Sequence, residues 1–269
     1  MSLRTGCVEN DHVRLEFALD AGPRIVHFSL RDGRNVFAET PDAGWETVHG
    51  RPYRLLGGHR LWSSPECPLN EQVPDDAPVG VRMLDGGVEL TGSTLTHDGL
   101  ARRIELRLTS DRPGVRVLHV LENKTDQAVR AAAWALTQLT PGGVAVLPLP
   151  AGDGDGEQLP NRNVVLWPYS SVRDARLELA DDAIRVATST GPPFKVGCLN
   201  RDGWVAYELD GVTFRKRFEP EPEEDHGDLG CNVEVYTNAE FLELETLTPL
   251  RQVAPGDAIE HVEEWELLS

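Results

Sequence analysis

The chain has 269 residues, with 44 acidic and 26 basic side chains and a formal net charge of −18. This charge argues against nucleic-acid binding, because such proteins gain most of their affinity by neutralising phosphates with Lys and Arg. Hydrophobic residues make up 40% and charged residues 26% of the chain, a mixture typical of a folded globular protein rather than a disordered one.

The N-terminal segment and the cysteines indicate the compartment. Residues 1–6 contain no apolar core of the kind that a secretory signal peptide needs. No apolar stretch reaches the roughly 18 residues of a membrane helix. The cysteines Cys7, Cys67, Cys198 and Cys231 are far apart, which argues against a zinc site and a disulfide scaffold. We therefore expect reduced thiols in a cytoplasmic protein that does not contact membranes.

Alternation of polar and apolar residues with a period of two dominates the chain and indicates β-strands. Residues 115–121 are apolar at almost every position, as a buried strand would be. The predicted strands include, in chain order, 12–17, 103–108, 115–121, 175–179, 183–187 and 204–209. Turn sequences such as Asp-Gly and Pro-Gly separate them. Short strands between regular turns predict an all-β sandwich or barrel rather than βαβ units.

Only one segment invites a helical interpretation. Residues 126–139 are rich in Ala, but they end in an alternating segment, so we predict a strand there as well. Three segments are expected to be loops: 65–78, 148–160 and the acidic run 219–225, the last a solvated surface loop. Neither a repeat nor a linker divides the chain, and we expect a single domain over residues 1–269.

Residues 231–246 are predicted to form a hairpin with a turn near 237–239 and one strongly polar face. Because side chains alternate along a strand, one face is apolar and carries Val233, Val235, Leu242 and Leu244. The other face carries Asn232, Glu234, Tyr236, Phe241, Glu243 and Glu245. Opposed side chains on paired strands lie about 5 Å apart, so carboxylates there raise one another's pKa unless cations or ligand hydroxyls compensate.

Carboxylates with perturbed pKa values in a concave site suit proton-transfer chemistry. The alternative is the wet face of a half-exposed sheet, with glutamates that pair with some of the many arginines.

The C-terminal part of this hairpin resembles the aldose 1-epimerase (galactose mutarotase) superfamily. Leu244-Glu245-Thr246 is followed by Pro249 and by Pro255-Gly256-Asp257 before a final strand. In that superfamily a Leu-Glu-Thr-Gln segment carries the catalytic glutamate, and a Pro-Gly-Glu turn leads into the last strand. Other segments agree in order: 21–33 with the opening hairpin, 57–62 with an early Gly-Gly substrate loop, and 121–125 with a mid-chain strand end that contains Asn.

More closely, the chain resembles a bacterial branch of this superfamily without an assigned function. The segments that match are 57–62 with Pro65-Glu66, 134–138 with 141–143, 167–169, 194–197, 214–218 and the Glu234 hairpin. The resemblance implies a galactose mutarotase-like β-supersandwich: two large antiparallel sheets with few helices, one sheet being concave and lined by the ligand site. It also makes Glu245 the candidate general base; from the shared face of the hairpin, we expect Glu234 or Glu243 to bind a hydroxyl group.

One departure from the family pattern bears on the chemistry. In the mutarotases a mid-chain His-x-x-Tyr-Phe segment supplies the acid, but this sequence has Trp134-Ala135-Leu136-Thr137-Gln138 there. Mutarotation needs a base for the anomeric hydroxyl and an acid for the ring oxygen, and losing one typically costs on the order of 10² to 10⁴ in rate. The candidates for the acid are His59, Lys195 and Lys216. Sugar binding without turnover is therefore an alternative.

Several residues are candidate ligand contacts. His59 follows Gly57-Gly58, where missing side chains let a backbone approach a ligand closely. Arg60 presents a planar donor fork that suits an anionic group of a ligand, or that neutralises Glu66 or Glu234. Aromatic rings offer stacking surfaces for sugars, although packing in the core is the usual role of a Trp. The expected substrate-binding set is Arg60, Trp62, Glu66, Trp134, Gln138, Tyr169, Lys195, Lys216, Tyr236 and Glu243, and the expected catalytic set is Glu245, His59 and Glu234.

We expect no metal and no cofactor. The segment 152–156, Gly-Asp-Gly-Asp-Gly, suggests calcium but lacks the closing Glu of an EF-hand loop. A second possibility, left open by the sequence, is that His226 and Asp228 join Glu234 in a metal site.

The leading hypothesis is a carbohydrate-binding protein that acts as an aldose epimerase or mutarotase on a monosaccharide or an acidic sugar. The first alternative is a non-catalytic sugar-binding or sensor module. The second is an oligosaccharide hydrolase or lyase with Tyr236 or Tyr169 as the acid. The expected partner is a small-molecule sugar, and the sequence leaves the oligomeric state open.

Overall fold

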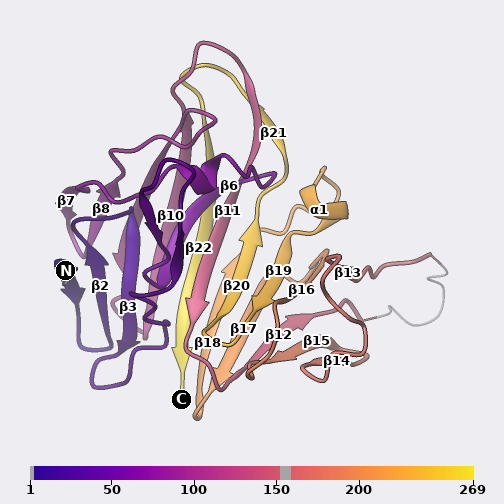
Figure 1. The fold of residues 1–269 in the computed structure, drawn as a ribbon. Helices are drawn as coiled ribbons and strands as arrows, with labels where there is room; N and C mark the ends of the chain where they lie inside the picture. The colour runs from indigo at the N-terminus through magenta and orange to yellow at the C-terminus, as the bar shows by residue number, and fades with distance from the viewer. Residues whose placement is uncertain (1–2, 152–158) are drawn as a thin grey trace.

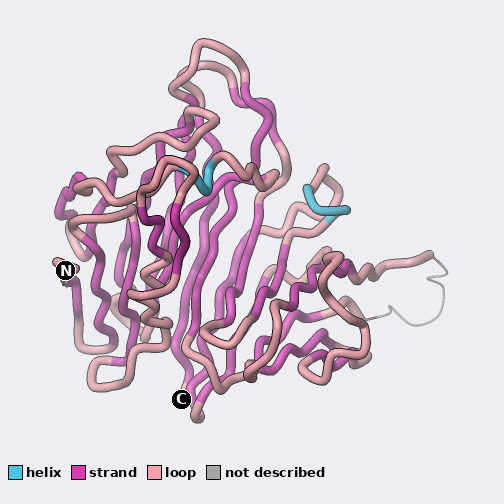
Figure 2. Tube along the Cα trace, in the orientation of Figure 1, coloured by secondary structure: helices cyan, strands magenta, loops and turns pink. Residues whose placement is uncertain are grey.

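The computed structural model describes residues 3–151 and 159–269; its regular secondary structure is almost wholly β, and most of its strands form two large antiparallel sheets (Figures 1 and 2). The predicted all-β architecture is confirmed. The helical segments within the described residues are a 3₁₀ turn, Asn70–Gln72, and the four-residue α1, Gly227–Gly230. None of the described helices has the length and apolar character needed to cross a bilayer.

The first sheet contains ten strands and carries the candidate site. Its order is β1 (Thr5–Glu9), β2 (Val13–Ala18), β3 (Arg24–Leu30), β6 (Gly58–Ser64), β11 (Val129–Leu139), β20 (Leu242–Leu247), β19 (Val233–Thr237), β16 (Phe194–Cys198) and β13 (Val165–Leu166), with β21 (Arg251–Val253) paired to the start of β11. The predicted strand within 126–139 is β11, and the predicted hairpin is β19–β20.

The second sheet packs against the inner face of the first and also contains ten strands. Its order is β14 (Leu177–Leu179), β15 (Ala183–Ala187), β12 (Val144–Pro148), β17 (Trp204–Leu209), β18 (Val212–Phe218), β22 (Ala258–Leu268), β10 (Gly114–Asn123), β9 (Leu100–Leu108), β8 (Gly87–Thr91) and β7 (Gly80–Leu84). A separate hairpin, β4 (Gly44–Glu46) with β5 (Pro52–Arg54), lies outside both sheets.

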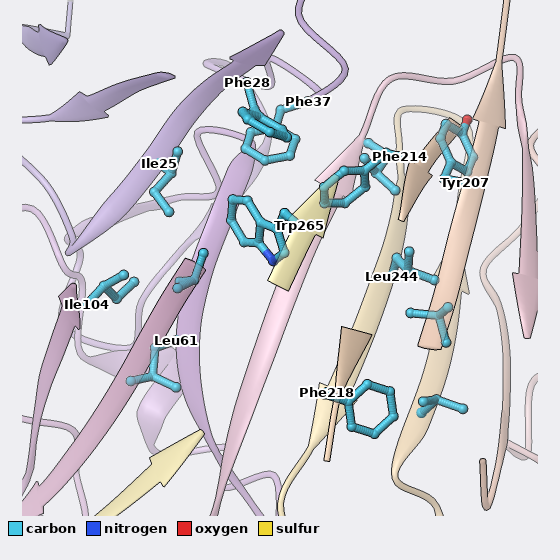
Figure 3. Packing of buried hydrophobic residues seen from close by; sticks show 14 of the residues in the cluster. Ile25, Phe28, Phe37, Leu61, Ile104, Tyr207, Phe214, Phe218, Leu244 and Trp265 are labelled. Carbon is cyan, nitrogen blue, oxygen red and sulfur yellow. The ribbon is translucent and has the colours of Figure 1, made fainter. Parts of the chain in front are cut away.

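Aromatic rings fill the space between the sheets. Trp265 on β22 is fully buried and makes edge-on contacts with Phe37 and Phe214, at ring-centroid distances of 5.7 and 5.6 Å. Figure 3 shows these rings gathered with Phe28, while Leu244 of the hairpin points into the same layer. Burial of this continuous apolar layer is what holds the two sheets together.

The hairpin divides its side chains between two environments, as its alternation predicts. The apolar residues Val233, Val235, Leu242 and Leu244 belong to the core. In the β19–β20 register, Glu234 lies directly opposite Glu245, and Tyr236 lies opposite Glu243. The inward side chains thus anchor the two strands, and the polar side chains between them face the outer side of the sheet.

Leu244→Ala is expected to destabilise the protein by about 2–5 kcal/mol, because it leaves a cavity in the core behind the polar residues. Met83→Ala on β7 is the matched control, since Met83 is 61% exposed and a surface change should stay within about 0.5 kcal/mol. Urea unfolding of both variants measures the two values. Equal losses would show that Leu244 does not pack as described.

Candidate functional site

The outer face of the first sheet carries a hollow of about 270 Å³ over β6, β11, β19 and β20. Small-molecule sites usually have volumes of roughly 300–1,000 Å³, so this hollow suits a small ligand. It is lined by Trp45, Leu55, Arg60, Trp62, Glu66, Glu71, Trp134, Leu136, Tyr169, Lys195, Tyr236, Asn238, Phe241 and Glu243. Most of the residues expected to bind substrate therefore do lie around one hollow.

Lys195 occupies the floor of the hollow and connects it to two carboxylates. Its ammonium nitrogen Nζ lies 2.6 Å from Glu234 Oε2 and 3.0 Å from Glu245 Oε2. The same nitrogen lies 4.7 Å from the ring centroids of both Trp134 and Trp167. Two indole faces and two carboxylates thus surround one cation, and each attracts it electrostatically.

Glu234 and Glu245 are completely buried beneath this lysine and do not line the hollow. Burial raises the pKa of both carboxyl groups, that of Glu234 well above its ordinary value. Burial alone would lower the pKa of the Lys195 ammonium, but the charges of Glu245 and Glu234 outweigh it and hold that pKa well above its ordinary value. The three groups titrate as one coupled unit.

Glu245 has one occupied and one free carboxylate oxygen. The indole nitrogen Nε1 of Trp134 donates a hydrogen bond to Glu245 Oε2 at 2.8 Å, and Lys195 donates to the same oxygen. Among the described residues, Oε1 has no hydrogen-bonding partner. A buried carboxylate oxygen without a donor is costly, so this oxygen is poised to accept a proton or a hydrogen bond.

A second charged group stands at the edge of the hollow. The Arg60 guanidinium packs over the Trp62 ring at 4.5 Å and lies 3.8 Å from Glu243 Oε1. Gln138 lies outside the lining and donates a hydrogen bond from Nε2 to Glu243 Oε1 at 2.9 Å. Glu243 is therefore held in place at the lining of the hollow, and Arg60 offers donors beside it.

The expectation that His59 reaches the hollow is wrong. His59 is completely buried on the inner side of β6, because neighbouring residues of a strand point to opposite faces and Arg60 points outward. Its Nδ1 lies 2.9 Å from Thr137 Oγ1, and its Nε2 lies 2.8 Å from His119 Nε2. His59 cannot touch a ligand in the hollow or act there as the acid.

The preceding glycines serve the fold rather than a ligand. Gly57 and Gly58 both have positive φ angles, 78° and 72°. A Cβ atom at Gly58 would lie 2.0 Å from the carbonyl oxygen of Ile25, and one at Gly57 would lie 1.9 Å from that of Ala38. These positions need glycine because neighbouring backbone approaches them closely.

The expectation that Lys216 binds substrate is also wrong. It is completely buried between the sheets, where Nζ pairs with Glu263 Oε1 at 2.7 Å and reaches the carbonyl oxygens of Ala135 and Leu244, each at 3.3 Å. Lys216 lies on β18 of the second sheet, behind the strands that carry the site. It therefore stabilises those strands from the inner side and does not bind substrate.

The group His59, His119 and Glu263 brings three possible metal-ligand atoms within 4.8 Å of one another. Each already has a partner, since the two imidazole Nε2 atoms face each other and Glu263 Oε2 accepts from the Trp265 indole at 2.7 Å. Lys216 also supplies Glu263 with its counter-charge. Burial lowers the pKa values of both histidines. We interpret the group as a neutral-histidine network that joins the sheets.

The metal site at His226, Asp228 and Glu234 that the sequence left open gains no support. In the described part of the chain, His226, Asp228 and Glu234 do not gather as a ligand group; His226 Nε2 instead lies 3.0 Å from the carbonyl oxygen of Glu221. The Gly-Asp-Gly-Asp-Gly segment 152–156 lies outside the described residues.

Sequence reasoning missed Trp45, which lines the hollow from the separate β4–β5 hairpin. Its ring stacks on Tyr53 with a centroid distance of 4.4 Å, and its Nε1 donates to the carbonyl oxygen of Glu71 at 3.0 Å. No motif surrounds this residue. Its one available signal was the scarcity of aromatic residues, 6% of the chain, which makes each Trp informative.

Lys195→Met is expected to cost about 3–5 kcal/mol at neutral pH, because it leaves two buried carboxylates without their cation. Both carboxyl pKa values rise further in the variant. A carboxyl group whose pKa is higher in the folded state than in the unfolded chain lowers the free energy of unfolding as pH rises above its unfolded pKa. The loss of stability in the variant should therefore be larger at pH 8 than at pH 5.

Urea unfolding at both pH values measures this difference. Lys124→Met is the control, since Lys124 forms an exposed pair with Glu122 and a change there should cost less than about 1 kcal/mol. An equal loss at pH 5 and pH 8 for Lys195→Met would contradict the coupling.

Comparisons with known proteins place this geometry in a known fold. No protein-family model matches the chain, and no curated protein sequence is similar to it. Among solved structures, a galactose mutarotase-like protein from Lactobacillus casei matches with a TM-score of 0.61 and 11% identity, over 98% of this chain and 100% of that chain. A "Putative aldose 1-epimerase" from Escherichia coli K12 matches with a TM-score of 0.58 and 12% identity, over 99% of each chain.

A TPR-domain containing protein from Parabacteroides distasonis matches with a TM-score of 0.65 and 12% identity, over 98% of this chain but 47% of that chain. The present chain thus spans about half the length of that protein. The similar structures are mostly aldose 1-epimerase or galactose mutarotase-like proteins, and at these identities the likeness establishes the fold. The chain has the galactose mutarotase-like β-sandwich fold that the sequence resemblance implied.

Proposed function

We propose that the hollow binds the pyranose ring of an aldose and accelerates the exchange of its anomers. Binding is supported by the mixture of side chains: aromatic rings that pack on the C–H faces of a sugar, and charged groups that hydrogen-bond its hydroxyls. Trp62, Trp134 and Tyr236 supply the first kind, and Arg60 and Glu243 supply the second.

The observation that carries the catalytic proposal is the adjacency of Lys195 and Glu245. The anomeric hydroxyl oxygen and the ring oxygen are bonded to the same carbon, so their base and acid must be neighbours. Lys195 Nζ and Glu245 Oε2 are 3.0 Å apart. In the proposed step Glu245 takes the proton of the anomeric hydroxyl, the C1–ring oxygen bond breaks, and Lys195 protonates the ring oxygen. Rotation about the C1–C2 bond and the reverse step give the other anomer.

Electrostatic coupling within the cluster supports this exchange. The charge of Glu245 is one of the two that hold the pKa of Lys195 high. When Glu245 accepts a proton this charge disappears, and the pKa of Lys195 falls. Proton uptake by the carboxylate and proton release by the ammonium therefore favour each other. When the ring closes, both groups regain their original protonation states.

Glu245→Gln is expected to lower the rate of anomer exchange by a factor on the order of 10² to 10⁴, because the amide cannot accept the proton. NMR exchange spectroscopy across a panel of aldoses measures the rate. Glu240→Gln, an exposed position in the turn of the same hairpin, is the control and should exchange anomers like the unchanged protein. Equal acceleration by Glu245→Gln removes the catalytic proposal.

The pH profile of the same reaction gives a separate check. Exchange requires ionised Glu245, and burial raises the pKa of this carboxyl group above its ordinary value. The rate should therefore fall as pH decreases, with its midpoint above the value of about 4.3 for an exposed Glu. A midpoint at or below that value would show that Glu245 is not the group that titrates.

Sugar binding without turnover is a second candidate function, and two observations favour it. Glu245 is completely covered by its neighbours, so a ligand must displace the Lys195 side chain to reach it. In addition, no histidine lines the hollow in the described chain. Isothermal titration calorimetry with the same aldoses separates the candidates, because binding with no acceleration of exchange supports this second function alone.

A further inference from the structure

A second, larger hollow adjoins the first across the Trp45 side chain. It has a volume of about 770 Å³ and lies between the β4–β5 hairpin and the outer faces of β2 and β3. Trp45 lines both hollows. The larger one holds none of the Lys195 cluster, so it is not the centre of the proposed reaction. A monosaccharide bound at that centre would leave this adjoining hollow empty, so the hollow needs an explanation of its own.

Trp45 is held rigidly at the junction. One face of its ring stacks on Tyr53 with an interplanar angle of 7°, and Tyr53 is itself buried. The hydrogen bond from Trp45 Nε1 to the carbonyl oxygen of Glu71 ties the hairpin to the loop that follows β6. Because Trp45 is only partly buried and lines both hollows, the part of its ring that they expose offers an apolar surface on which a sugar ring can pack.

The polar lining of the larger hollow limits the charge of what it binds. Its side chains include the carboxylates of Glu16, Glu39, Asp42 and Glu46 against the single guanidinium of Arg54. Glu16 is already paired with Arg14, at 2.6 Å. Burial lowers the pKa of His27, so this imidazole is neutral at neutral pH. Carboxylates accept hydrogen bonds from hydroxyl groups, whereas an excess of negative charge repels a phosphate or a uronic acid.

We infer that the two hollows form one binding tract for a neutral oligosaccharide of at least two units. The reducing unit occupies the first hollow, above Lys195 and the buried Glu245, and the next unit packs on Trp45 and enters the second hollow. This inference rests on the proposed function, since it identifies the ligand of the same site. A monosaccharide then fills only the smaller part of the tract.

Calorimetric titration with glucose, galactose, maltose, cellobiose and lactose tests the inference. At least one disaccharide should bind at least about tenfold more tightly than its reducing monosaccharide, because it adds a stacked unit. Ala43→Trp fills the second hollow, which Ala43 lines without lining the first. This variant should lose the gain for disaccharides and keep the affinity for the monosaccharide.

A disaccharide with a glucuronic acid as its non-reducing unit should bind more weakly than its neutral counterpart. His27→Ala provides a second variant within the larger hollow and should reduce only disaccharide binding if Ala43→Trp does not fold. Monosaccharide binding with no gain from a second unit overturns the inference and leaves the proposed function standing. Failure of every saccharide to bind overturns the proposed function, and the inference falls with it.

Discussion

The ion cluster around Lys195 is the interaction on which the candidate site depends. Two glutamates directly opposite each other on paired strands would repel, and burial would make that repulsion stronger. The Lys195 side chain comes from the next strand, β16, and places its positive charge against both carboxylates. Without it, the strands could stay paired only with protonated carboxyl groups, and the floor of the hollow would lack both a carboxylate that accepts a proton and an ammonium group that donates one.

Strand alternation gives the first sheet two separate polar systems. On the outer face Arg60 lines the hollow, Gln138 holds Glu243 at its edge, and Glu245 lies beneath Lys195. On the inner face their sequence neighbours His59, Thr137 and Thr246 form a buried network. In this network Thr246 Oγ1 donates to Glu263 Oε1 at 2.5 Å, and Lys216 neutralises the same carboxylate. Such a satisfied network orients strands without exposing charge, so it holds the residues of the candidate site in register from behind.

Charge also connects the proposed chemistry with the proposed ligand. The first hollow is lined by the cations of Arg60 and Lys195 beside Glu66, Glu71 and Glu243, whereas the larger hollow is lined by four carboxylates and the single cation of Arg54. The hydroxyl groups of a neutral sugar can donate hydrogen bonds to acceptors along both hollows, but an anionic group needs one of these three cations to form an ion pair. The net charge of −18 acts in the same direction over the whole molecule.

The sequence by itself determined the all-β class, the β19–β20 hairpin and the separation of its faces, because a period of two in polarity acts locally and each strand obeys it. It also brought Arg60, Lys195 and the three glutamates into one hypothesis. Tertiary structure alone decided that His59 and Lys216 point inward, that Glu245 lies beneath Lys195, and that Trp45 joins the hollow. Those outcomes depend on which face of each strand meets the second sheet and on contacts between segments distant in the chain. The local periodicity of polar and apolar residues determines neither of them.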